Sequence, residues 1–423
     1  MGLVGRTRCG LAEDAKIWRL QILAVHFAEG LNMNWDFPED RASKRLYLLD
    51  AVESVRPIVL AGVDEAEASY ALPNASFEAL YDAGLFWLKL PEVLGGAEAD
   101  PLIQIEVIAA LAEVDASAAW SVMIGSQSTG LPAAWLPEDA LEVVFGGRRV
   151  PVVAGSLMPS GTAERVPGGY RVTGRWAFAS GIRHCDWVNA TVRLDDTPHG
   201  GLPSLRRVVV PTADVEVHDN WDAVGLRGSG SCDFSINDVF VRESLSWGFT
   251  DPPRRGGRLY LLGLPGYVAY EHAALALGVG RRALDLMVDK ATTKARGFEG
   301  SIVGDRPAFQ RDLGRMDMQL SAARAMTFEV FEEVWSGLEP GVGPRPDQQA
   351  RMRSAASLAT EISLDVITRL FRYSGGDAVY ASSDVQRCWR DLSTAGQHFL
   401  VSESAYEHHG RFLLGRPDAK PFG

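Results

Sequence analysis

The chain is poor in residues that hold metal ions or form disulfide bonds. Its 423 residues include eight scattered histidines and four cysteines, Cys9, Cys185, Cys232 and Cys388. The cysteines show neither metal-ligand spacing nor a disulfide framework. There is also no HExxH, CxxC or GxxxxGKS/T pattern. The sequence therefore predicts no metal site and no nucleotide-binding P-loop.

Net positive charge and long apolar runs are also missing. The formal net charge is −12, whereas a nucleic-acid-binding protein needs a basic face. No stretch reaches the roughly 18 uninterrupted apolar residues of a membrane-spanning helix. The N-terminal residues carry no A-x-A cleavage pattern. We therefore expect a cytoplasmic protein that binds neither nucleic acid nor membrane.

The chain is long enough for two or three domains, and 46% of its residues are hydrophobic. Residues 1–32 are expected to be an extension, because Met33 and the residues after it look like the start of the folded part. Within residues 33–149, apolar side chains recur at helical spacing. This spacing predicts an N-terminal helical domain.

The sequence pattern changes twice further along the chain. Over residues 150–245, short runs rich in valine and aromatic residues alternate with turn residues, which predicts a small antiparallel β-barrel or sandwich. Over residues 260–415 helical spacing returns, and we expect four long helices packed as an antiparallel bundle. The predicted fold class is therefore α+β, mainly α, with a small central barrel between two helical domains.

Residues 386–402 combine helical spacing with a single histidine. Their apolar residues lie three or four apart, which predicts a core-facing stripe within a helix over residues 383–413. His398 follows Thr394 by one turn, at the end of that stripe. An isolated histidine on a helix is more often structural than catalytic. The residue alone therefore does not decide a function.

The order of these parts and several local motifs resemble the acyl-CoA dehydrogenase superfamily over about residues 40–415. The motifs are residues 83–96, 170–176, 225–231, 239–241 and 374–376. Within the superfamily, the chain is most similar to the group D two-component flavin-dependent monooxygenases. That closer similarity lies in residues 176–181, 222–231 and 386–402.

The chain departs from true acyl-CoA dehydrogenases at one position. Those enzymes need a carboxylate base to remove a proton from an acyl thioester, and here Phe399 stands where many of them have it. Glu271, on an earlier helix, is the alternative base, although it is off the family position by about a turn. A second interpretation is therefore an acyl-CoA dehydrogenase or CoA-thioester oxidase with a displaced base. A third, a flavin-free subunit, is disfavoured by the intact flavin-like motifs.

The resemblance implies a monooxygenase that uses reduced FMN or FAD and O2 through a C4a-(hydro)peroxyflavin. The expected substrate is small and aromatic or cyclic, free or CoA-linked. A separate flavin reductase is expected to supply the reduced flavin, because Gly278-x-Gly280 lies inside a helical pattern and does not fit a dinucleotide fingerprint. The resemblance also implies a homotetramer whose flavin sites borrow residues from a neighbouring subunit.

The resemblance further assigns roles to residues. His398 and Ser180 are the expected catalytic residues, the first as a hydrogen-bond donor to the activated oxygen and the second as a contact to flavin N5. The expected flavin-binding residues are Ser180, Trp176, Ser156, Leu157, Arg296, Gly375, Gly376 and Gln397. The expected substrate-binding residues are Trp120, Ile124 and Gln127.

Some of these residues also fit plainer roles. Ser180 is equally suited to a turn before Gly181, and Trp176 to the core of the β-domain. Residues 101–150 contain no histidine that could deprotonate a phenol, which disfavours a simple phenol as substrate. His184 could replace such a histidine in part, but a histidine in a loop is usually solvated.

Overall fold

Five α-helices precede the sheet in the computed structural model, which describes residues 35–195, 204–293, 295–296 and 300–422. They are α2 (Arg41–Ser69), α3 (Asn74–Asp82), α4 (Pro101–Val114), α5 (Ala116–Trp135) and α6 (Glu138–Phe145). Asp100 and Asp115 cap α4 and α5 by accepting hydrogen bonds from backbone N–H groups. The predicted extension over residues 1–32 lies outside the described residues.

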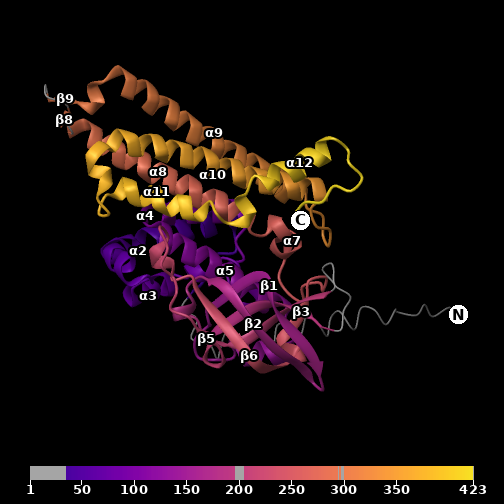
Figure 1. The fold of residues 1–423 in the computed structure, drawn as a ribbon. Helices are drawn as coiled ribbons and strands as arrows, with labels where there is room; N and C mark the ends of the chain where they lie inside the picture. Colours follow the sequence, from indigo (N-terminus) through magenta and orange to yellow (C-terminus); the bar gives the residue numbers. More distant parts are fainter. Residues whose placement is uncertain (1–34, 196–203, 294, 297–299, 423) are drawn as a thin grey trace.

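α4 and α5 are apolar on nearly all sides because other elements cover them on nearly all sides. α4 packs against α8 (Ala269–Thr293), and α5 packs against strand β1 (Val153–Val166). Figure 1 shows α5 between the sheet and the long C-terminal helices. α5 can therefore present side chains to both at once.

A seven-stranded sheet follows, in the order β5-β6-β2-β1-β3-β4-β7. Its other strands are β2 (Gly169–Ala179), β3 (Trp187–Leu194), β4 (Leu205–Pro211), β5 (Glu216–Val217), β6 (Cys232–Arg242) and β7 (Ser246–Gly248). The predicted small antiparallel barrel was wrong, because the sheet is open and β1 pairs with β3 in parallel. The edge strands β5 and β7 have two and three residues, which is too short for them to close a barrel against each other.

Register shifts interrupt the pairing in the middle of the sheet, and two of them lie beside residues of interest. The β1–β3 register shifts between Ser156 and Gly161, and the β2–β6 register shifts between Trp176 and Ala179. Such shifts take backbone N–H and C=O groups out of the regular ladder. These groups can then bind something other than a neighbouring strand.

Above the sheet (Figure 1), three long helices lie side by side with a shorter one of 12 residues: α8, α9 (Pro307–Gly337), α10 (Pro346–Ser374) and the shorter α11 (Asp384–Ala395). The short α7 (Gly263–Gly266) precedes them, α12 (Ser404–Leu413) packs on α10, and β8 (Ala295–Arg296) pairs with β9 (Ser301–Ile302) between α8 and α9. Because α8 also packs on α4, the two helical parts share one core. None of the described helices has the length and apolar character needed to cross a membrane.

The single helix predicted over residues 383–413 was wrong. α11 ends at Ala395, a short 3-10 turn covers Phe399–Val401, and α12 starts at Ser404. His398 has an extended backbone (φ −69°, ψ 135°), and its Nδ1 accepts a hydrogen bond from the Leu400 N–H. His398 therefore lies in a turn between two helices, not on a helical face.

Candidate active site

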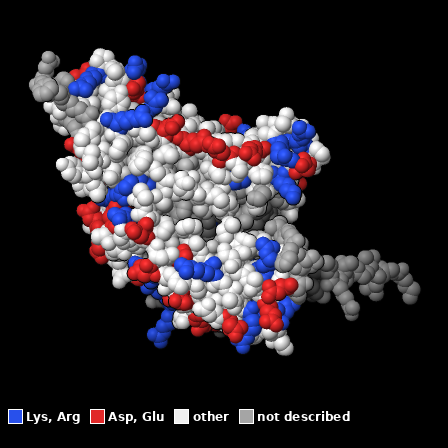
Figure 2. All heavy atoms as spheres, viewed as in Figure 1, with Lys and Arg blue, Asp and Glu red and all other residues white. Residues whose placement is uncertain are grey.

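A cavity of about 1040 Å³ lies between α5, the interrupted strands, the segment before α8 and the turn after α11. Its volume is at the upper end of the usual range for small-molecule sites, roughly 300–1,000 Å³. The wall contains two side chains that can carry a positive charge, Arg207 and, when protonated, His398. None of the described residues in the wall is a carboxylate. On the face shown in Figure 2, charged side chains lie around the hollow between the helical layer and the sheet rather than within it.

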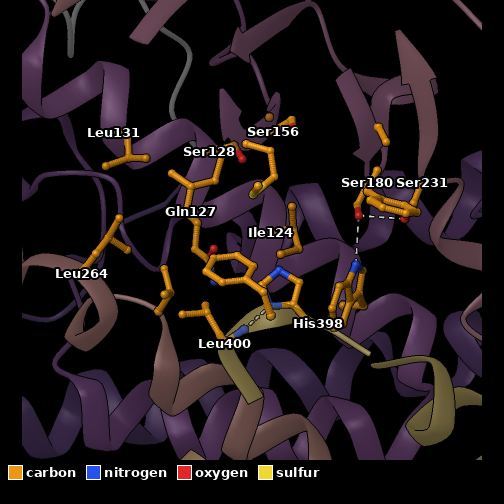
Figure 3. Close-up of a pocket in the computed structure, with 18 of the residues that line it drawn as sticks. Ile124, Gln127, Ser128, Leu131, Ser156, Ser180, Ser231, Leu264, His398 and Leu400 are labelled. Carbon is orange, nitrogen blue, oxygen red and sulfur yellow. Dashed lines mark hydrogen bonds between the residues drawn. The ribbon is translucent and has the colours of Figure 1, made fainter. Parts of the chain in front are cut away.

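His398 projects into this cavity from the turn after α11 (Figure 3). Its ring stacks on His272 with the ring centres 4.4 Å apart, and Trp120 meets it edge-on at 5.9 Å. Burial, together with the positive charge of Arg353, lowers the pKa of His398 to about 4. Since Nδ1 accepts from the Leu400 N–H at 3.4 Å, the proton of the neutral ring belongs on Nε2.

Ser180 belongs to a line of hydroxyl groups at another wall of the cavity (Figure 3). Trp120 Nε1 donates to Ser180 Oγ at 2.9 Å, and Ser180 Oγ lies 2.7 Å from Ser231 Oγ. Ser231 Oγ in turn lies 2.8 Å from Ser229 Oγ. Trp120 therefore contacts His398 with its ring and orients Ser180 with its N–H.

The backbone beside Ser180 is strained. Phe178 has φ 64° and Leu226 has φ 51°, a left-handed region that side chains other than glycine rarely adopt. Both residues line the cavity. Asp391 holds Leu226 in place, because its Oδ1 accepts from the Leu226 N–H at 2.7 Å. Strain of this kind is often found at functional sites.

A buried polar cluster lies behind Gln127, which lines the cavity. Gln127 Nε2 donates to Glu271 Oε2 at 2.5 Å, and Lys89 Nζ lies 3.0 Å from the same oxygen. Burial raises the pKa of Glu271 to about 7 and lowers that of Lys89 to about 8. Both side chains are fully buried, and Glu271 is absent from the cavity wall.

The structure brings most of the predicted site residues together. Around the cavity lie His398, Ser180, Ser156, Leu157, Gln397, Trp120, Ile124 and Gln127. They come from α5, β1, the turn after β2 and the turn after α11. Segments that are far apart in the sequence therefore meet at one place.

Four predicted residues lie elsewhere or outside the description. Trp176 is fully buried and stacks on Phe234 inside the sheet domain, which favours its core role. Gly375 and Gly376 lie at the end of α10 and do not line this chain's cavity. Arg296 belongs to β8, but its side chain lies outside the described part of the structure.

His184 is also away from the cavity wall. Its ring stacks on Phe77 with the centres 4.4 Å apart, and its Nε2 lies 2.9 Å from the Leu72 carbonyl oxygen. Burial lowers the pKa of His184. This position does not favour a role in deprotonating a substrate.

Sequence reasoning missed Arg207 and the Lys89–Glu271 pair. Arg207 is buried, lines the cavity and donates to Ser156 O at 2.9 Å, and burial lowers its pKa to about 9. Its signal was a charged residue at the start of a valine-rich strand. Lys89 likewise stands alone between two leucines, although neither pattern identifies a partner.

The residues around the cavity fit a flavin ring. Leu157, Met158 and Ser160 line the cavity where β1 leaves register with β3, so their backbone groups lie outside the β1–β3 pairing and suit a polar ring edge. Ser180 adds a hydroxyl group, and aromatic side chains supply flat apolar surfaces. The cavity has room for a flavin ring beside a second small molecule.

Comparison with known families agrees with this fit. Residues 50–135 match the model of the acyl-CoA dehydrogenase N-terminal domain, and residues 270–403 match that of the acyl-CoA dehydrogenase C-terminal domain. Together the two models match more than half of the chain. The predicted superfamily is therefore confirmed.

Individual relatives are flavin-dependent monooxygenases. The chain is 27% identical to an indole-3-acetate monooxygenase of Pseudomonas putida, over 79% of this chain and 85% of the relative. It is 28% identical to HsaA of Rhodococcus jostii, the oxygenase subunit of a flavin-dependent monooxygenase, over 87% and 98% of the two chains. The solved structure of XiaF from Streptomyces sp., in complex with FADH2 and glycerol, is 28% identical with a TM-score of 0.79, over 89% and 96% of the two chains. The chain belongs to the acyl-CoA dehydrogenase superfamily, and its relatives there are flavin-dependent monooxygenases.

Proposed function

We propose that the protein is the oxygenase component of a two-component system that inserts oxygen from O2 into a small aromatic substrate, with FMN or FAD in reduced form. The observation that carries this proposal is the cavity wall itself. It holds a neutral imidazole that can donate from Nε2 and a serine hydroxyl, and no carboxylate among the described residues. This set suits the protection of an activated oxygen atom better than the removal of a carbon-bound proton.

The flavin would lie along the interrupted strands. Backbone groups from Leu157 onward would bind its polar edge, because the Ser156 oxygen already accepts from Arg207, and Ser180 would contact N5. When bound in reduced form, the flavin supplies the reaction with O2. The chain's own contribution is to orient the ring, to exclude water and to place hydrogen-bond donors.

His398 would act as a donor at the reacting oxygen. With a pKa of about 4, it stays neutral at pH 7 and keeps the Nε2 proton. A neutral N–H donor can stabilise negative charge that develops on the oxygen, and it does not give up its proton before the reaction begins. Stacking on His272 and the Leu400 hydrogen bond fix the direction of that N–H.

The position of Glu271 does not support the dehydrogenase alternative. A catalytic base must come within hydrogen-bond reach of the proton it removes. Glu271 is fully buried, and Lys89 and Gln127 share its Oε2. Gln127, not Glu271, lines the cavity.

We further propose a flavin reductase as partner and a homotetramer as the active state. The relative from Rhodococcus jostii is named an oxygenase subunit, which supports a separate reductase. For the tetramer, support comes from the turn after α10, where Val379 and Tyr380 are 76% and 70% exposed beside Gly375 and Gly376. A neighbouring subunit that covers this turn would bring the two glycines to a flavin.

The direct test is turnover with a reductase from another source. The purified protein is mixed with that reductase, NADH, FMN or FAD and a panel of indoles and phenols, and products are identified by mass spectrometry. A product 16 mass units heavier than its substrate supports the proposal. Oxidation of an acyl-CoA by tightly bound FAD, with no such product, would contradict it.

A further inference from the structure

The side chain of Gln127 is held in one orientation by the buried cluster behind it. Its Nε2 lies 2.5 Å from Glu271 Oε2, and Lys89 Nζ approaches the same oxygen at 3.0 Å. A carboxylate oxygen only accepts hydrogen bonds. If Glu271 were protonated, its unpartnered Oε1 could carry the proton, so Oε2 would still accept from Gln127.

The fixed nitrogen determines which atom faces the cavity. With Nε2 turned toward Glu271, the carbonyl oxygen Oε1 of Gln127 is left as an acceptor. Within the described residues, no side chain or backbone group donates a hydrogen bond to this oxygen. Gln127 lines the cavity, and in Figure 3 it lies between Ser128 and His398. The wall therefore offers an oriented acceptor to which no described residue donates a hydrogen bond.

Burying the charged pair Lys89–Glu271 to hold the Gln127 amide costs free energy. Lys89 and Glu271 are completely buried, and burial of two charges in a protein interior is usually unfavourable unless they are paired and hydrogen-bonded. Lys89 also donates to Tyr270 Oη at 2.6 Å and to the Tyr267 backbone oxygen. These contacts hold the Lys89 ammonium in place. Its ion pair then holds the Glu271 carboxylate, whose hydrogen bond orients the Gln127 amide.

We propose that Gln127 determines specificity by accepting a hydrogen bond from a ring N–H or O–H group of the aromatic substrate. Glu271 and Lys89 are positioning residues that keep its oxygen turned toward the cavity. The inference rests on the proposed function in one respect, namely that this cavity is the substrate site.

An amide acceptor also restricts what happens to that donor. A carboxamide oxygen accepts a hydrogen bond but is too weak a base to take the proton. α5 contributes no histidine to the wall. A substrate held by Gln127 therefore keeps its proton, as an indole N–H or an un-ionised hydroxyl group does.

Matched ligand pairs test this inference without turnover. Dissociation constants are measured by calorimetry for indole against 1-methylindole and for phenol against anisole, with the full-length protein. Loss of one hydrogen bond is worth about tenfold in affinity, so each donor ligand is expected to bind about tenfold more tightly than its methylated partner. Gln127→Met keeps the length of the side chain and should bring both ratios close to one. The two pairs show separately whether N–H and O–H donors are accepted.

Two further variants separate recognition from packing. Leu131→Ala, one turn along α5 in the same wall, should weaken both members of each pair alike and leave the ratios unchanged. Lys89→Met with Glu271→Leu removes both charges and frees the Gln127 amide, so the ratios should fall toward those of Gln127→Met. Unchanged ratios in this double variant would contradict the positioning role.

The remaining outcomes are distinct. The inference is overturned if the affinity ratios of the ligand pairs are the same in Gln127→Met and in the parent. It is also overturned if that variant loses FMN affinity while the ratios stay intact, because Gln127 would then hold flavin. A protein that shows the Gln127-dependent ratios but hydroxylates no aromatic compound contradicts only the proposed function. A protein that hydroxylates them with ratios indifferent to Gln127 contradicts only this inference.

Discussion

His398 changes meaning once its surroundings are known. In the sequence, His398 ends an apolar stripe of helical spacing. In the structure, it lies in the turn after α11, and its side chain points into the cavity beside His272 and Trp120. Its low pKa follows from burial and from the nearby Arg353. A histidine in that state is a directed hydrogen-bond donor more than a proton shuttle at neutral pH.

Replacement of His398 by alanine should uncouple O2 consumption from product formation. Without the Nε2–H donor, more of the oxygen is expected to leave as H2O2, and the coupled fraction should fall by about tenfold or more. The measurement compares product with H2O2 per O2 consumed. His218→Ala is the control, because His218 lies outside the cavity wall and bonds to Ser235. Equal coupling in parent and His398→Ala would return His398 to a structural role.

Ser180→Ala should lower stability as well as flavin affinity. The change removes the acceptor of the buried Trp120 N–H, and an unsatisfied buried donor costs about 1–3 kcal/mol. Urea unfolding measures the first effect and titration with reduced FMN the second. Ser229→Ala, at the far end of the same hydroxyl line, should leave FMN affinity near the parent value. If Ser180→Ala loses stability alone, the contact to flavin is wrong.

At the scale of elements, α11 connects α2 to the loop that contains Val224 and Leu226, which lines the cavity. Arg390 donates to Val224 O at 2.7 Å and pairs with Glu67 of α2 at 2.7 Å, while Asp391 accepts from Leu226. The strained conformation at Leu226 therefore depends on contacts from a helix more than 160 residues away.

Asp391 should make stability depend on pH. Burial, and to a lesser degree the nearby Asp115, raise its pKa from the ordinary 3.8 to about 7. The folded state thus favours the protonated form, so this group's contribution is complete below about pH 4 and is lost as the pH rises through about 7. Asp391→Asn keeps an oxygen for the Leu226 N–H but does not titrate. Its unfolding free energy should fall less between pH 4 and pH 8 than that of the parent, and parallel profiles in urea unfolding would refute this.

Local pattern predicted the kinds of element well and their joining less well. The helical spacing of residues 33–149 and the valine-rich runs after residue 150 were sufficient for the order helical, β, helical. The open sheet was not predictable, because closure depends on pairing between the distant and very short β5 and β7. The break after Ala395 was missed because Gly396 is tolerated within an apolar helical pattern.

The same limit applies to the site. Ser180, His398 and the strand near Ser156 were found through motifs, each in a short segment. The partners of Gln127 could not be found that way, because Lys89 and Glu271 are 38 and 144 residues away and meet it only through packing. Local patterns carry no information about such meetings. The proposed domain boundaries and the cytoplasmic location stay predictions.

At the scale of the whole molecule, the exposed turn after α10 should join subunits. Tyr380→Glu places a charge where an apolar contact is proposed, so the variant should dissociate to smaller species and bind FMN more weakly. Light scattering coupled to size-exclusion chromatography measures the mass. Phe240→Glu, at a partly exposed position on β6, is the matched control. A tetramer that persists in Tyr380→Glu, or a parent that is monomeric and still binds flavin, would exclude this interface.

The protein as a whole has the acyl-CoA dehydrogenase fold, and none of the described residues in its cavity wall is a carboxylate. If the protein is an oxygenase, an atom of O2 must enter the substrate, and isotope labelling detects that atom. Reduced FMN or FAD, the protein and indole are mixed under ¹⁸O2, and the product is analysed by mass spectrometry. We expect one ¹⁸O atom per product molecule, with loss of that product in His398→Ala. A product that carries oxygen only from water, or no oxygenated product across the panel of aromatic compounds, would contradict it.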